Sequence, residues 1–108
     1  MSDSGHDSKD GKSLRERLKE SLDESPWSWL RRHAARDAVI LVKAELDLLD
    51  VGEAVAKNES KLISAWVESG KIGKPTEAQL EAWEKVLDKK FLVVVVQPFV
   101  LAQEHLVH

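Results

Sequence analysis

Apolar residues are spaced in two different ways along this chain, and each spacing predicts a different kind of element. Two short runs, 38–42 and 91–96, are almost wholly apolar and rich in β-branched residues. Such runs are typical of strands that are buried on both faces of a sheet. Elsewhere apolar residues recur every three or four positions, which predicts amphipathic helices. The pattern therefore predicts an α+β fold, with about five helices packed on a small sheet of two or three strands.

Capping residues indicate where the helices begin. Ser13 is followed three positions later by Glu16, the pattern of a capping box, so we expect a first helix from residue 14 to about residue 24. Ser25 followed by Pro26 predicts the start of a second helix, because proline suits the first helical position. Three further helices are expected after the capping residues Asp47, Asn58 and Thr76.

Pro98 interrupts the apolar segment 91–104 near the end of the chain. A two-residue hairpin at Gln97-Pro98 would call for residues with positive φ, which proline cannot adopt. We therefore expect one long strand with Pro98 at an unpaired position, or a bend at Pro98, in place of a hairpin.

The chain is organised as one domain with a polar N-terminal segment. Residues 1–12 contain no sizeable apolar residue after Met1 and are predicted to be disordered, while residues 13–108 form a single α+β domain. A length of 108 residues suits one hydrophobic core, and no internal repeat is visible.

Composition narrows the class of protein. The chain has no cysteine, which excludes disulfides and thiolate metal sites. Its net charge of −3 gives no general attraction to nucleic acid. No segment approaches the roughly twenty apolar residues that span a bilayer, and the first residues are too polar for a signal peptide. We therefore expect a cytoplasmic protein with no membrane partner.

The segment 51–72 has the spacing of a helix-turn-helix, in which a second helix enters the DNA major groove. Between residues 46 and 70, however, two lysines stand against five acidic residues. Carboxylates oppose the approach to phosphates, so a packed helix pair is favoured and nucleic acid is an unlikely partner. The alternative is a degenerate winged-helix-like module that binds nucleic acid through the cations Arg31, Arg32, Lys71 and Lys74.

The main cationic cluster consists of Arg31, Arg32, His33 and Arg36. Arginine side chains of this kind could hold a phosphate or an acidic partner. Cations near a helix C-terminus also simply complement its dipole, and this second interpretation is favoured. The balance would shift if the fold brought three lysines beside the arginines: Lys43, Lys71 and Lys74.

Two of the four tryptophans, Trp27 and Trp29, cannot face the same way on one helix, because two residues turn by about 200°. Trp29 is therefore the candidate for an exposed contact, a position in which tryptophan often carries binding energy. Together with the cationic cluster it defines the predicted binding surface: Trp29, Arg31, Arg32, His33 and Arg36.

Catalytic chemistry has little support in the sequence. His33 and Asp37 lie four residues apart, and Glu53 could join them in the fold as an acid–base group. A solvated surface histidine is the favoured interpretation, and no nucleophile or glycine-rich loop suggests an enzyme. No cofactor or metal is expected, because the other histidines lack ligand spacing: His6, His105 and His108.

Several segments together resemble a known family. They are residues 33–40, 46–56, 66–70, Pro75-Thr76, Trp83 and the Val-Gln-Pro-Phe-Val-Leu sequence at 96–101. On these segments the chain is similar to a bacterial family of uncharacterised proteins, domain of unknown function 2288, over about residues 14–104. The resemblance implies membership of a family and no activity, ligand or site.

Taken together, these patterns predict a small cytoplasmic protein-binding or regulatory domain without catalytic activity. Its partner would be another protein or a second copy of the chain. Three observations lie behind this expectation: no catalytic constellation is visible, a small sheet has edges to cover, and one tryptophan cannot be buried beside its neighbour.

Overall fold

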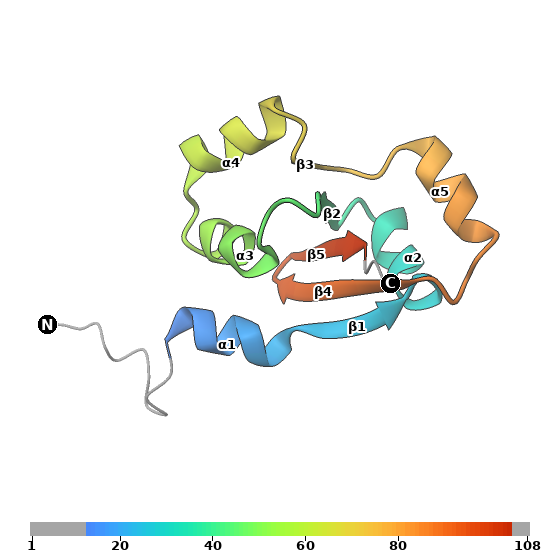
Figure 1. Ribbon diagram of the computed structural model, residues 1–108, viewed down its shortest axis with the longest axis horizontal. Helices are drawn as coiled ribbons and strands as arrows, with labels where there is room; N and C mark the ends of the chain where they lie inside the picture. Colours follow the sequence, from blue (N-terminus) through green and yellow to red (C-terminus); the bar gives the residue numbers. More distant parts are fainter. Residues whose placement is uncertain (1–12, 105–108) are drawn as a thin grey trace, which may run out of the picture.

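The computed structural model describes residues 13–104, which form five helices and one five-stranded sheet (Figure 1). The elements in chain order are α1 (Leu14–Ser21), β1 (Asp23–Pro26), α2 (Trp27–Ala35), β2 (Val39–Val42), α3 (Leu48–Ala56), α4 (Ser60–Glu68), β3 (Ile72–Gly73), α5 (Glu77–Glu84), β4 (Lys90–Val96) and β5 (Phe99–Glu104). The predicted tail, 1–12, and residues 105–108 lie outside the described residues. None of the described helices is long and apolar enough to cross a membrane.

The sheet has the strand order β1-β4-β5-β2-β3. β2 pairs with β5 in parallel, and the other neighbours are antiparallel. The α+β class is confirmed, but the prediction of two or three strands is wrong. The two additional strands, β1 and β3, are four and two residues long and carry no alternating apolar pattern, so no local pattern predicts them.

Helices cover both faces of the sheet, and each face has its own hydrophobic core. β4 shows the division most clearly: Phe91 and Val93 belong to one core, and Val94 and Val96 to the other. One core lies under α1 and α3 and contains Leu18, Val42, Leu48, Val51, Ile72, Val94, Val96 and Leu101. The other lies under α2 and α5 and contains Trp27, Leu30, Val39, Trp83, Phe91, Val93, Val100 and Ala102. The prediction that the apolar runs are strands with residues buried on two faces is therefore confirmed, although Ile40, Leu41 and Leu92 are half-buried and Val95 is 39% exposed.

β4 and β5 form a hairpin, so the prediction of one long or bent strand at Pro98 is wrong. Val96 pairs with Phe99, and Gln97 and Pro98 make the turn between them. The Gln97–Pro98 peptide bond is cis. Proline thus occupies the third position of the turn, as in type VI turns, a geometry that needs no residue with positive φ.

Three of the five predicted helix caps are confirmed. Ser13 with Glu16 and Thr76 with Gln79 form capping boxes at the starts of α1 and α5. Asp47 caps α3, because its carboxylate accepts a hydrogen bond from the backbone N–H of Leu49 at 2.8 Å.

The other two caps are wrong, as is the expected end of the first helix. Ser25 lies in β1 opposite Phe91, and that strand starts at Asp23, where the first helix was expected to continue. Asn58 has a φ of 57° and occupies the turn after α3, so Glu59 is the residue that precedes α4. Short asparagine side chains tolerate this left-handed conformation, which competes with their role as caps.

Candidate functional site

Helix α2 and Arg36, the residue directly after it, expose one continuous stripe of aromatic and cationic side chains. Trp29, Arg32, His33 and Arg36 are spaced i, i+3, i+4 and i+7, which places them on the same side of a helix. The buried side of α2 carries Trp27 and Leu30, which belong to the core beneath the helix. We call these four residues the α2 stripe.

Trp29 is the apolar member of the α2 stripe and is 36% exposed. Its ring centroid lies 4.5 Å from that of His33, with the two rings tilted by 49°. Trp27, two residues earlier, is only 1% exposed and packs against Trp83. The prediction that these two tryptophans face different ways is confirmed, and it leaves one indole on the surface, held beside an imidazole.

Arg31, which the sequence grouped with this surface, lies away from the α2 stripe. Its Nε donates to the Glu84 carboxylate at 3.1 Å, and its terminal nitrogen contacts the other oxygen of the same carboxylate. Glu84 also accepts a hydrogen bond from the indole N–H of Trp27 at 2.7 Å. Arg31 therefore belongs to a contact that joins α2 to α5.

Arg32 and Arg36 are the cations that remain available. Neither guanidinium forms an ion pair within residues 13–104, and the nearest polar contact of Arg36 is Nδ1 of His33 at 3.5 Å. Partial burial, followed by the charges of Arg36 and Arg32, lowers the pKa of His33 from its ordinary value of 6.5. At neutral pH the stripe thus presents two charged guanidinium groups around two uncharged rings.

The acid–base group suggested by the sequence is not assembled. The carboxylate of Asp37 pairs with Lys74 at 2.9 Å. The carboxylate of Glu53 is on α3, where it accepts from Arg15 at 2.9 Å, and α3 covers the opposite face of the sheet from α2. His33 contacts Trp29 and Arg36 and has no carboxylate partner within the described residues.

The three lysines that could have enlarged the cationic cluster have other surroundings. Lys74 is paired with Asp37, next to the end of the α2 stripe, so its charge is compensated there. Lys71 lies 3.5 Å from the carboxylate of Glu45. Lys43 forms no ion pair within residues 13–104 and lines a separate hollow.

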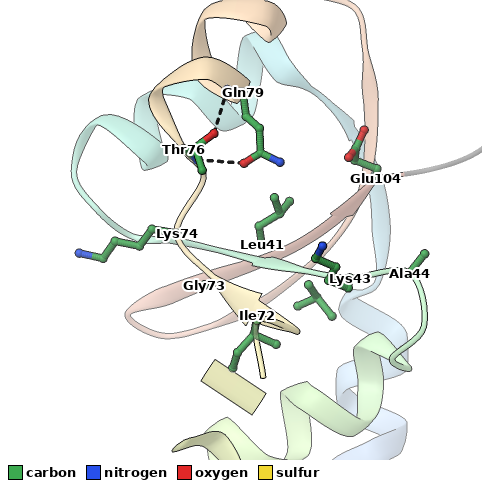
Figure 2. Close-up of a pocket in the computed structure, with 11 residues that line it drawn as sticks. Leu41, Lys43, Ala44, Ile72, Gly73, Lys74, Thr76, Gln79 and Glu104 are labelled. Carbon is green, nitrogen blue, oxygen red and sulfur yellow. Dashed lines mark hydrogen bonds between the residues drawn. The ribbon is translucent and has the colours of Figure 1, made fainter. Parts of the chain in front are cut away.

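That hollow, of about 400 Å³, lies between α5 and the β2–β3 edge of the sheet. Figure 2 shows Leu41 in the middle, Gln79 on the α5 side and Gly73 and Ile72 on the β3 side. The sequence did not predict this hollow, because its walls come from three segments far apart in the chain. The linker 71–76, with its glycine and two lysines, is the signal that could have suggested it.

A smaller hollow, of about 270 Å³, lies between α3 and α4 and is lined by Leu62, Trp66, Glu53 and Glu59, among others. Beside it Arg15 of α1 contacts three carboxylates at 2.8 to 3.1 Å, those of Asp47, Asp50 and Glu53. Within the described residues no group of His, Asp and Glu side chains is arranged to hold a metal ion. The other histidines, His6, His105 and His108, lie outside those residues.

The helix-turn-helix-like segment consists of α3 and α4, which pack against each other. α3 contributes Val51 and Ala54 to the interior, while α4 has no buried residue. Three acidic residues and one lysine line the hollow between them, and Arg15 pairs with two of the three carboxylates. This arrangement accords with the favoured interpretation, a packed pair of helices.

Comparison with known proteins gives a family and one structural relative. The chain matches the family described as protein of unknown function DUF2288 over residues 13–104. It is also similar to PA1075 from Pseudomonas aeruginosa, which was solved in solution by NMR, with 29% sequence identity and a TM-score of 0.69. That likeness covers 94% of this chain and 97% of the other. No curated protein matches the chain.

Proposed function

The chain belongs to the DUF2288 family, and from this premise we propose that it is a protein-binding domain that holds an acidic segment of a partner protein on the α2 stripe. The observation that carries the proposal is the stripe itself. Two guanidinium groups without carboxylate partners in residues 13–104, Arg32 and Arg36, lie on the same helix face as the exposed indole of Trp29.

The chemistry of the α2 stripe suits an acidic and partly apolar segment. Arginine forms paired, charge-assisted hydrogen bonds with carboxylates, and an exposed tryptophan offers a large rigid apolar contact. The stripe occupies about two helical turns, a length that fits a short peptide or one helix of a partner. Because the lowered pKa keeps His33 neutral at pH 7, the imidazole adds contact area and leaves the charge to the arginines.

Neither edge of the sheet is suited to pairing with a strand of a partner, which favours binding through a helix surface. β1, at one edge, consists of Asp23, Glu24, Ser25 and Pro26, and acidic residues and proline both discourage pairing with a further strand. β3, at the other edge, has only two residues, and Pro75 follows closely. A partner strand would find few backbone groups to pair with at either edge.

A role without catalysis is part of the same proposal. In residues 13–104 no polar or charged side chain is buried, whereas acid–base catalysts usually sit in partly buried clefts that shift their pKa. His33, the one histidine of these residues, is flanked by a cation and an aromatic ring.

The nucleic-acid alternative draws less support from the geometry. Of the cations it relied on, Arg31, Lys71 and Lys74 each have a carboxylate partner, and Arg32 alone has none within the described residues. Duplex DNA needs a basic surface that follows several phosphates, and two free arginines on one short helix cover little of it.

The test is a titration of the ¹⁵N-labelled protein with a synthetic peptide of glutamates around one leucine, beside a matched peptide with glutamine in place of glutamate. We expect the acidic peptide to shift the Trp29 indole N–H and the amides of α2, and the matched peptide to leave them in place. Arg32→Gln and Arg36→Gln should each weaken binding about tenfold, which corresponds to about 1.4 kcal/mol.

Arg31→Gln is the matched control, because it removes the same charge from the same helix outside the α2 stripe. Equal weakening by Arg31→Gln and Arg32→Gln would show that only net charge matters, and would contradict the proposal. If a random DNA duplex bound more tightly than the acidic peptide at the same salt concentration, the nucleic-acid alternative would be favoured over the protein-binding proposal. Sedimentation would identify a second copy as the partner if the molar mass of the protein rose with its concentration. The Arg32→Gln variant should then keep the mass of a monomer.

A further inference from the structure

The hollow between α5 and the β2–β3 edge is a second surface feature, independent of the α2 stripe. Its volume of about 400 Å³ lies in the range of pockets that hold small molecules. Its floor is formed by Leu41 of β2 and Gly73 of β3, which are paired across the two strands. A Cβ atom built on Gly73 would meet nothing within 4 Å, so the absence of a side chain there helps to keep the hollow open.

The polar groups around this floor are donors of hydrogen bonds. Lys43, directly after β2, has no ion-pair partner within residues 13–104. The side-chain oxygen of Gln79 accepts from the backbone N–H of Thr76 at 2.9 Å, which leaves the amide NH₂ of Gln79 on the side facing the hollow (Figure 2). An ammonium group and a primary amide supply five donor hydrogens between them.

The other charged groups at the hollow are compensated. Glu104, the last residue of β5, pairs with Lys89 at 3.0 Å. Lys74 points away from Leu41 in Figure 2 and pairs with Asp37. The uncompensated charge at the hollow is therefore the positive charge of Lys43.

The loop that carries Lys43 is fixed in place. The amide of Gln103 donates to the backbone oxygens of Lys43 and Leu46, at 2.9 and 2.7 Å. The backbone N–H of Lys43 donates to the oxygen of Lys71 at 2.9 Å. β2 and β5 run parallel and end side by side here, and the carboxyl ends of parallel strands are where open sheets commonly bind ligands.

From these observations we infer that the hollow binds a small organic carboxylate with a flat apolar body. The carboxylate would accept hydrogen bonds from the ammonium of Lys43 and the amide of Gln79, and the apolar body would cover Leu41 and Gly73. This binding needs no protein partner, so the inference can be tested independently of the function proposed for the α2 stripe.

The probe for the test is benzoate, titrated into the ¹⁵N-labelled full chain and followed by amide chemical shifts. Benzamide is the uncharged counterpart of the same shape, and inorganic phosphate is the anion without an apolar body. We expect saturable shifts with benzoate at residues 41–44, 72–76 and 79, at least tenfold weaker binding of benzamide, and no saturation with phosphate.

Two variants test the two halves of the inference. Lys43→Met removes the charge while keeping a long side chain, and should weaken benzoate binding at least tenfold. Gly73→Val fills the floor and should abolish the shifts. Lys61→Met, on the exposed surface of α4, is the matched control and should bind benzoate as the unaltered protein does.

Each contrary result overturns the inference. Absence of saturable shifts up to the solubility of benzoate excludes the site, and equal affinity for benzamide excludes recognition of the carboxylate. Should Gly73→Val be poorly folded, as judged by its amide spectrum, Lys43→Met alone decides between the outcomes. Arg32→Gln should bind benzoate normally, which separates this result from the test of the α2 stripe.

Discussion

Glu84 is predicted to be more important for stability than Arg31, although the two form one ion pair. The carboxylate of Glu84 holds both the guanidinium of Arg31 and the indole N–H of Trp27. In the ion pair, the side chains of Arg31 and Glu84 are 49% and 41% exposed, so water screens their attraction. Exposed pairs of this kind contribute about 0–1 kcal/mol to stability.

The hydrogen bond to Trp27 has a larger effect, because Trp27 is 1% exposed and, within residues 13–104, Glu84 is the one acceptor of its indole N–H. A buried donor left without a partner destabilises a protein by about 1–3 kcal/mol. We therefore expect Glu84→Ala to lower the free energy of unfolding by about 1.5–3 kcal/mol. Arg31→Ala should lower it by about 1 kcal/mol or less, because the bond between Glu84 and Trp27 survives.

Urea unfolding of the two variants, followed by circular dichroism, measures both free energies. Glu84→Gln is the matched control, because its side-chain oxygen can still accept from the indole, and it should fall between the two. The indole N–H resonance of Trp27 should move upfield in Glu84→Ala and stay in place in Arg31→Ala. Equal destabilisation by Arg31→Ala and Glu84→Ala would refute the reasoning, because it would show that the ion pair and not the bond to Trp27 carries the effect.

Three further predictions concern the core, a titration and a helix cap. Val94→Asp should unfold the domain, because it places an unpaired carboxylate at a fully buried position, whereas Val95→Asp, 39% exposed on the next residue of the same strand, should stay folded; amide spectra distinguish the two. His33 should titrate below 6.5 by NMR, and Arg36→Gln should raise its pKa toward that value. Since folding lowers this pKa, the contribution of His33 to stability should be present above pH 6.5 and decline as the pH falls below it. Thr76→Ala should destabilise the protein by about 0.5–2 kcal/mol in urea unfolding, since it removes the cap of α5.

Local signals in the sequence located most of the helices but fewer of the strands. Ser13 was recognisable as a cap because its capping-box partner, Glu16, follows at the required spacing, and Thr76 because it precedes an amphipathic segment; the structure adds Gln79 as the partner of Thr76. β1 was missed because its pairing with β4 is a tertiary contact, and nothing in Asp-Glu-Ser-Pro favours a strand. The hairpin at Pro98 was missed because a cis proline at the third position of a turn needs no residue with positive φ, whereas the common two-residue hairpins do.

Four of the five residues predicted for the binding surface lie on the α2 stripe, and the fifth, Arg31, does not. Helical spacing alone separated Trp29 from Trp27, and it could also have placed Arg32, His33 and Arg36 beside Trp29. The removal of Arg31 from this group depends on Glu84, which is 53 residues away in the chain. The hollow at Lys43 depends on three distant segments in the same way, so no local pattern could define it.

Helix α4 has a consequence for motion, because none of its residues is buried although Leu62 and Val67 are apolar. Opening this helix would expose only the partly buried faces of Ile63 and Trp66, and no fully buried side chain of its own. We therefore expect its amides to exchange with solvent through local unfolding, before those of β4 and β5. Native-state hydrogen exchange should then show two tiers of protection, with the segment 60–68 released while the sheet remains intact. Helix α4 would therefore open and close on a sheet that stays folded, with a free energy of local unfolding that is smaller than that of the whole domain.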